Sequence, residues 1–156
     1  MALEIERKFL VKDASFLKET HGIFYRQGYL VLGADKTVRV RTSGQRAYLT
    51  IKGPSHGMSR SEYEYEIPLA DANEMLNTIC HQPLIEKTRY VIPQGDVKWE
   101  VDVFAGANEG LVVAEVELSS EDTPISLPVW LGREVTGEVR YFNAYLVEHP
   151  YATWST

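Results

Sequence analysis

Acidic and basic side chains recur two residues apart in several short segments of the chain. Glu4 and Glu6 form one such acidic pair, and Arg39 and Arg41 form one such basic pair. The other members of the pattern are Lys8, Lys52, Glu62 and Glu64, Lys87 and Arg89, Lys98, Glu100 and Asp102, and Glu115 and Glu117. Because successive side chains on a β-strand point to opposite faces of the sheet, each set is predicted to lie on one face.

A charged strand face that simply meets water is the ordinary explanation of any one of these segments. Here, however, the charges recur on nearly every predicted strand, and acidic pairs and basic pairs fall on different strands. Like charges two residues apart repel one another, and lining a barrel with them is costly unless they are paired, hydrated or bound to ions. The pattern therefore favours a polyanion that is bound together with divalent cations.

The residue types indicate which chemistry such a site would support. Carboxylate oxygens suit Mg²⁺ or Mn²⁺, which shares phosphate oxygens, while Arg and Lys side chains neutralise and orient the remaining oxygens. Phosphoryl transfer requires this combination, in which the protein positions the phosphate groups and stabilises their charge. We expect a metal ion or a carboxylate to activate water, and a cation opposite to stabilise the leaving diphosphate. His21, His56, His81 and His149 are predicted to lie at the surface, so no nucleophilic triad is expected.

Short strands are the elements that must position these charges. Period-two alternation bounded by Gly, Pro, Asn and Asp predicts strands at 3–11, 24–32, 36–43, 46–53, 60–68, 85–92, 97–104 and 111–119. Helices are predicted at 13–21, capped by Asp13, at 71–81, opened by Asp71, and at 137–148, preceded by Thr136. The predicted fold class is α+β, an antiparallel eight-stranded β-barrel with peripheral helices, in a single domain over residues 1–156.

Composition excludes several classes of protein. The chain has 156 residues and a formal net charge of −6, which argues against a general nucleic-acid binder. It has one cysteine, Cys80, which cannot form an intramolecular disulfide. The first residues lack the apolar stretch of a signal peptide, and no apolar run approaches the ~20 residues that span a bilayer. We therefore expect a cytoplasmic protein without a membrane or nucleic-acid partner.

The alternating charges Glu4, Glu6 and Lys8, followed by Phe9 and Leu10, resemble the ExExK signature of the CYTH family, the triphosphate tunnel metalloenzymes. The resemblance continues in order through residues 27–30, 38–41, 50–53, 60–66, 86–90, 99–104, 114–118 and 132–136. It implies an antiparallel eight-stranded tunnel that binds a triphosphate with a divalent metal ion, Mg²⁺ or Mn²⁺.

The resemblance also implies roles for individual residues. The implied metal-side carboxylates are Glu4, Glu6, Glu115 and Glu117, supported by Asp102. The implied substrate contacts are Lys8, Arg39, Arg41, Lys52, Lys87, Arg89 and Arg133, with Glu62 and Glu64 in the tunnel and their register against Glu66 left open. The catalytic group is then expected to be Glu4, Glu6, Lys8, Arg39, Arg41 and Lys52.

We expect hydrolysis of inorganic triphosphate (tripolyphosphate) to diphosphate and phosphate. A class IV-type adenylyl cyclase and a nucleoside or thiamine triphosphatase are the alternatives within the family, and a polyphosphate-binding regulatory module is the alternative outside enzymes. The sequence shows no distinct signature for binding a base. The C-terminal aromatic residues Trp130, Tyr141, Tyr145, Tyr151 and Trp154 are predicted to pack in the core, with a homodimer contact as one alternative.

Overall fold

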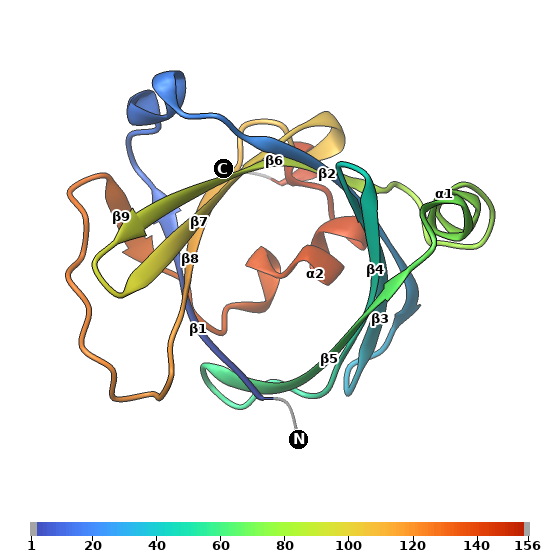
Figure 1. Ribbon diagram of the computed structural model, residues 1–156, viewed down its shortest axis with the longest axis horizontal. Helices are drawn as coiled ribbons and strands as arrows, with labels where there is room; N and C mark the ends of the chain where they lie inside the picture. The colour runs from blue at the N-terminus through green and yellow to red at the C-terminus, as the bar shows by residue number, and fades with distance from the viewer. Residues whose placement is uncertain (1–2, 155–156) are drawn as a thin grey trace.

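Nine antiparallel strands form one sheet, and eight of them close into a ring (Figure 1). The structure, a computed structural model, describes residues 3–154. The strands are β1 (Leu3–Val11), β2 (Ile23–Leu32), β3 (Thr37–Ser43), β4 (Arg46–Lys52), β5 (Ser59–Ile67), β6 (Ile85–Gln94), β7 (Val97–Phe104), β8 (Val112–Glu117) and β9 (Leu131–Glu134). Their order is β5-β4-β3-β2-β6-β7-β8-β1, and pairing of β5 with β1 closes the barrel. The predicted eight-stranded antiparallel barrel is confirmed.

Strand β1 is the seam of the barrel. Leu3–Ile5 pair with β5, Glu6–Leu10 pair with β8, and the last residues of β1 pair with β9. The sequence prediction did not include β9, since its four residues are too few to show an alternating pattern. It forms because β5 leaves the edge of β1 after Ile5, and the backbone of 131–134 takes up the free hydrogen-bonding groups there.

The helical segments differ in detail from the prediction. The segment 13–21 contains only a short 3₁₀ helix, η1 (Ser15–Glu19), although the Asp13 carboxylate does accept a hydrogen bond from the Ser15 amide. Helix α1 (Leu69–Thr78) begins two residues early, after Pro68, so Asp71 lies in its first turn rather than at its cap. The segment 137–148 divides into η3 (Val139–Tyr141) and α2 (Asn143–Glu148). Two further 3₁₀ turns are η2 (Gly106–Asn108) and η4 (Tyr151–Thr153).

Helix α1 packs on the outer face of β3 and β4. Its residues Ala72 and Leu76 are fully buried against Val40 and Ala47, and burial of a leucine of this kind contributes about 1.5–3 kcal/mol. Strand β2 passes directly beneath the end of this helix, because a Cβ atom on Gly28 would lie 2.8 Å from the Cβ of Cys80. Position 28 must therefore remain glycine while the chain keeps this packing.

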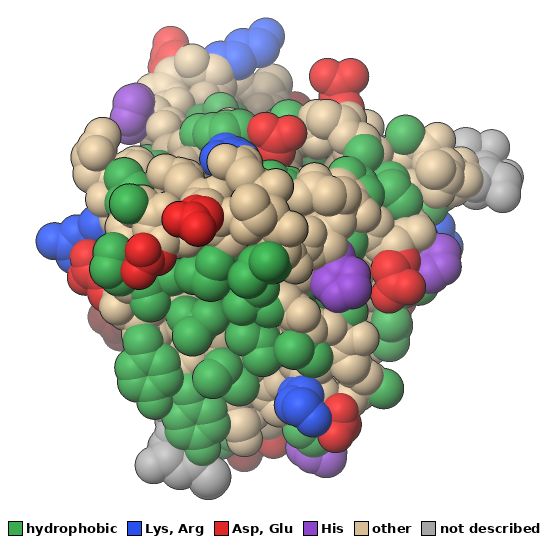
Figure 2. All heavy atoms as spheres, turned by 90° about the vertical axis from the view of Figure 1, so that its right-hand side faces the viewer, with side chains coloured by type: hydrophobic (Ala, Val, Ile, Leu, Met, Phe, Trp, Pro, Cys, Tyr) green, Lys and Arg blue, Asp and Glu red, His purple; other side chains and the backbone are tan. Residues whose placement is uncertain are grey.

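The outer face of the barrel is largely uncharged. Leu49 pairs with Tyr65 and Ile51 pairs with Tyr63 across β4 and β5, and these side chains point away from the barrel interior. Figure 2 shows the side of the molecule that carries α1, where hydrophobic side chains gather and charged side chains are few and scattered. The charged strand faces therefore point inward, as the alternation predicts.

The C-terminal segment lies across one end of the barrel, and α2 appears within the outline of the ring in Figure 1. Tyr141, Leu146 and Val147 are buried in a cluster with Ile85 and Phe104 of the barrel wall. On the outside, Trp130 meets Trp99 edge-to-face at 5.8 Å between ring centroids. The predicted core packing of these aromatic residues is confirmed for Tyr141, while Trp130 and Trp154 are partly buried against core clusters. Within residues 3–154, no helix combines the length and apolar character needed to traverse a bilayer.

Candidate functional site

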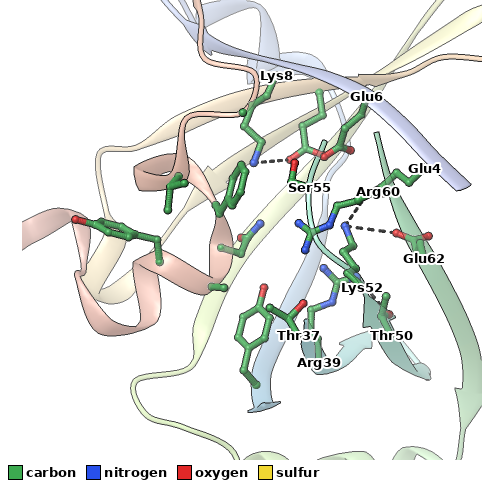
Figure 3. A pocket seen from close by; sticks show the side chains of 18 of the residues that line it. Glu4, Glu6, Lys8, Thr37, Arg39, Thr50, Lys52, Ser55, Arg60 and Glu62 are labelled. Carbon is green, nitrogen blue, oxygen red and sulfur yellow. Dashed lines mark hydrogen bonds and ion pairs between the residues drawn. The ribbon is translucent and has the colours of Figure 1, made fainter. Parts of the chain in front are cut away.

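A cavity of about 570 Å³ lies inside the barrel, and the charged faces of the strands line it. Twelve of the predicted site residues line it: Glu4, Glu6, Lys8, Arg39, Arg41, Lys52, Glu62, Glu64, Lys87, Arg89, Glu115 and Glu117. Figure 3 shows Glu4, Glu6 and Lys8 of β1 facing the same space as Arg39 of β3 and Lys52 of β4. The structure does not bring Asp102 and Arg133 into this lining.

Carboxylates dominate the β1–β8 wall of the cavity. The register places Glu6 opposite Glu117 and Lys8 opposite Glu115. Burial, followed by repulsion from Glu115 and Glu4, raises the pKa of Glu6 well above its ordinary value. Burial also acts to raise the pKa of Glu115, but Lys8, Arg89 and a hydrogen bond from Glu6 hold it well below the ordinary value. The two carboxyl groups are therefore perturbed in opposite directions, with the neutral form favoured at Glu6 and the charged form favoured at Glu115.

A second pair of carboxyl groups, Glu4 and Glu62, meets at Lys52. The Lys52 ammonium lies 2.9 Å from Glu4 Oε1 and 3.4 Å from Glu62 Oε2. Burial, a hydrogen bond to Glu4 and repulsion from Glu4 raise the pKa of Glu62 to about 7. The acidic side of the cavity thus carries more carboxyl groups than its lysines neutralise.

Arginines and a lysine form the opposite wall on β3 and β6. The guanidinium of Arg39 donates to Thr50 Oγ1 at 3.3 Å, and that hydroxyl donates to Glu64 at 2.8 Å. The Tyr25 ring lies between two cations, 4.9 Å from the guanidinium carbon of Arg41 and 5.0 Å from that of Arg89. Burial and the neighbouring cations Arg39 and Arg89 lower the pKa of Arg41. Concentrated positive charge of this kind favours an anion.

Asp102 lies behind this wall and pairs with its cations. Its carboxylate accepts hydrogen bonds from Lys87 Nζ at 2.7 Å and from Arg89 Nε and Nη2 at 2.7 and 2.9 Å. The side chains of Asp102 and Lys87 are both 1% exposed. Burial lowers the pKa of Lys87 to about 7, against the opposing effect of Asp102. The geometry assigns Asp102 to the cation side, whereas the sequence resemblance placed it with the metal ligands.

Arg133 and Glu66 lie away from the cavity. The Arg133 side chain is 58% exposed and forms an ion pair with Glu138 at 2.7 Å. Glu66 is exposed and lies 3.9 Å from Arg46. Of the three glutamates on β5, Glu62 and Glu64 line the cavity and Glu66 does not, which answers the question that the sequence left open. All four histidines are exposed, as predicted.

The sequence prediction assigned no role to Arg60 and Phe142, which also line the cavity. Arg60 lies opposite Glu4 and shares the strand parity of Glu62, a signal that could have identified it. Phe142 belongs to the segment before α2, and its ring lies 5.5 Å from Lys8 Nζ and 5.9 Å from the guanidinium carbon of Arg60. The carbonyl of Tyr141 accepts a hydrogen bond from Lys8 at 3.1 Å. No pattern in the sequence indicates these C-terminal contacts.

Comparison with known proteins agrees with this geometry. The CYTH domain matches residues 2–151. The chain belongs to the CYTH domain family. It is 51% identical over 151 residues to an inorganic triphosphatase of Acetivibrio thermocellus, covering 97% of each chain. It is 42% identical over 149 residues to an inorganic triphosphatase of Nitrosomonas europaea, covering 92% of this chain and 95% of the relative.

A solved structure of an inorganic triphosphatase superposes on this CYTH chain with a TM-score of 0.65. The two sequences are 37% identical, and the match covers 92% of this chain and 96% of the other.

The CYTH family implies a divalent metal ion, and the donor chemistry of the cavity fits one. In the part of the chain that the structure describes, no three acidic, His or Cys side chains already lie in a metal-binding cluster. Burial and neighbouring carboxyl groups instead raise the pKa values of Glu6 and Glu62. A divalent cation between these carboxyl groups would take their oxygens as ligands and remove the repulsion, which suits a hard ion such as Mg²⁺.

Proposed function

We propose that this chain hydrolyses inorganic triphosphate to diphosphate and phosphate inside the barrel. The observation that carries the proposal is the division of one cavity into a carboxylate wall on β1 and β8 and a cationic wall on β3 and β6. The two relatives named as inorganic triphosphatases support the choice of substrate.

We infer that Glu4, Glu6, Glu115 and Glu117 hold the divalent ion, Mg²⁺ or Mn²⁺. These four lie on two adjacent strands and all line the cavity. A divalent ion bound there supplies charge neutralisation for the phosphate oxygens and lowers the pKa of water in its vicinity. Glu62 and Glu64 stand beside Lys52 and Arg39 and balance the charge of those cations.

The cations of the chain bind and orient the triphosphate. Arg39 and Arg41 present guanidinium groups from β3, and Lys87 and Arg89 present an ammonium and a guanidinium group from β6, so one wall of the cavity offers several cations to a linear anion. Asp102 fixes the positions of Lys87 and Arg89 through its three hydrogen bonds. Positioning and preorganised charge of this kind stabilise the charge that grows on the leaving diphosphate.

The C-terminal segment shields one part of the cavity. Phe142 and the segment around it cover the cavity near Lys8 and Arg60. A low local dielectric strengthens each contact between a cation and a phosphate oxygen. All of these groups come from one chain. A homodimer and a cytoplasmic location remain predictions from the sequence.

Incubation of the purified protein with Mg²⁺ or Mn²⁺ and tripolyphosphate tests the proposal. We expect orthophosphate release from tripolyphosphate, with slower release from ATP and thiamine triphosphate, and none when the metal is chelated. Formation of cyclic AMP from ATP would assign the chain to the cyclases. Tight binding of tripolyphosphate without turnover would instead make it a polyphosphate-binding module.

A further inference from the structure

Four buried polar atoms on two adjacent strands have no partner among the described residues. They are Nε2 and Oε1 of Gln27 on β2, and the Nε atoms of Arg39 and Arg41 on β3. Within residues 3–154 these are all the buried side-chain nitrogen and oxygen atoms that lack a hydrogen bond. Native proteins pair nearly all such groups, with protein or with ordered water. Their concentration at one place in the cationic wall requires an explanation.

Gln27 lies inside the barrel, behind the surface that lines the cavity. Its neighbour Gly28 faces α1 on the outer side, in contact range of Cys80 and Leu84, so the Gln27 side chain points inward. In the strand register Gln27 lies opposite Arg41 on β3 and opposite Ile85 on β6. The side chain is 0% exposed and is absent from the cavity lining, whereas Arg39 and Arg41 belong to that lining. Gln27 is therefore placed to act on the arginines rather than on a ligand.

The chemistry of the four atoms is complementary. A guanidinium only donates hydrogen bonds, and a carboxamide both donates and accepts. The two arginines thus offer two unpartnered Nε–H donors, and the Gln27 carboxamide offers one unpartnered acceptor, Oε1, and one unpartnered donor group, Nε2, on the neighbouring strand. A water molecule can accept from two donors and donate to this acceptor, and buried waters of this kind bridge polar groups in most folded proteins. An uncharged residue suits the position, because Arg41 already lies beside the cations Arg39 and Arg89.

We propose that Gln27 is a positioning residue that holds the Nε edges of Arg39 and Arg41 through a buried water, so that their Nη groups face the triphosphate. The Nη groups are the ones already directed into the cavity, since Arg39 Nη2 reaches Thr50 and Arg41 Nη2 lies 3.6 Å from Glu64. The inference rests on the proposed function for its substrate, but the arrangement of the arginines concerns any phosphate anion.

Gln27→Met tests the proposal because methionine keeps the length of the side chain and removes both polar atoms. Calorimetry with metal-chelated protein and tripolyphosphate should show an affinity about tenfold weaker, the effect of one hydrogen bond to a charged group. In the assay with metal, KM should rise by a similar factor while kcat changes by less than about twofold. Gln45→Met, in the exposed turn between β3 and β4, is the matched control and should leave both values unchanged.

The melting temperature shows how far Gln27→Met disturbs the fold. Under the proposal the variant leaves the Nε–H donors of Arg39 and Arg41 without the acceptor that the water reaches, so a modest fall in melting temperature is expected. The split between KM and kcat separates positioning from a structural role, because a general disturbance of the barrel would lower kcat together with the affinity. An unchanged affinity, or a kcat that falls as much as the affinity does, overturns the proposal.

A double-mutant cycle tests the route through the arginines. Arg41→Lys removes Nε while keeping the charge, so Gln27→Met should cost clearly less affinity in the Arg41→Lys background than in the wild type. Full additivity would overturn the proposal. If the wild-type protein failed to hydrolyse tripolyphosphate, the proposed function would fail, while these affinity and melting measurements would still decide the role of Gln27.

Discussion

The buried triad of Asp102, Lys87 and Arg89 allows the most direct test of the site. Asp102→Asn preserves the shape of the side chain and removes its charge, which leaves Lys87 and Arg89 buried without their counterion. The side chains of Asp102 and Lys87 are 1% exposed and that of Arg89 is 9% exposed, so water cannot compensate for the loss. Removing one partner of a buried ion pair costs about 3–5 kcal/mol. We expect a loss of stability of that size.

Urea unfolding of metal-free protein, followed by tryptophan fluorescence, measures this free energy. Glu134→Gln is the matched control, because Glu134 also pairs with an arginine through two hydrogen bonds, at 2.8 and 3.0 Å, but at the surface. Surface pairs contribute about 0–1 kcal/mol, so this variant should stay close to the wild type. Equal stability losses in the two variants would refute the idea that Asp102 is needed to compensate buried charge.

The same variant distinguishes the two roles considered for Asp102. Without Asp102 the pKa of Lys87 falls below its present value of about 7, because burial then acts without opposition from that carboxylate. At neutral pH the lysine is mostly uncharged, and KM for tripolyphosphate should rise. If the variant instead needed more Mg²⁺ for half-maximal rate and kept its stability and KM, Asp102 would be a metal ligand.

Three further predictions concern the carboxylate and cationic walls. The pKa of Glu62 in the folded protein, about 7, is above its unfolded value, so its stabilisation is complete below pH 4.5 and is lost as the pH rises through 7. Melting temperatures of metal-free protein should therefore fall over this range, and Glu62→Gln should flatten the fall; an unchanged slope would contradict the assignment. Glu6→Gln should raise the metal-free melting temperature, because it removes repulsion from Glu115, and should increase the metal concentration needed for half-maximal rate. Arg39→Ala should raise KM roughly 10- to 100-fold, from about 1.5–3 kcal/mol per hydrogen bond to a charged group, with the fold retained by circular dichroism.

The inward orientation of the charges was predictable because strand geometry fixes it. Side chains alternate with a period of two, so the parity of Glu4, Glu6 and Lys8 determines their common face once β1 is recognised. The predicted strands agree with the observed ones to within two residues at each end, and the strands at 3–11 and 97–104 agree at both ends. Parity also explains why Arg60, two residues before Glu62, belongs to the same face.

Depth within the barrel was not predictable from parity. Glu100 and Asp102 share a face, yet Glu100 lines the cavity while Asp102 lies in the buried wall. The difference arises from the register that sets Asp102 opposite Arg89, and register depends on pairing between strands rather than on either strand alone. Arg133 shows the same limit, because its position follows from where β9 attaches to β1. The C-terminal contacts with Lys8 depend on a short helix whose placement only tertiary packing determines.

The seam at β1 has a consequence for the order in which the protein folds. Strand β1 is the first to be synthesised, but it pairs with β8 and β9, and Lys8 reaches a carbonyl 133 residues further along the chain. Until those partners emerge from the ribosome, only Leu3–Ile5 of β1 have their permanent neighbour, strand β5. Contacts of such long sequence separation slow folding, since loop closure must precede any gain from the contact. Closure of the barrel, and with it assembly of the two charged walls, is therefore expected to be among the last steps of folding.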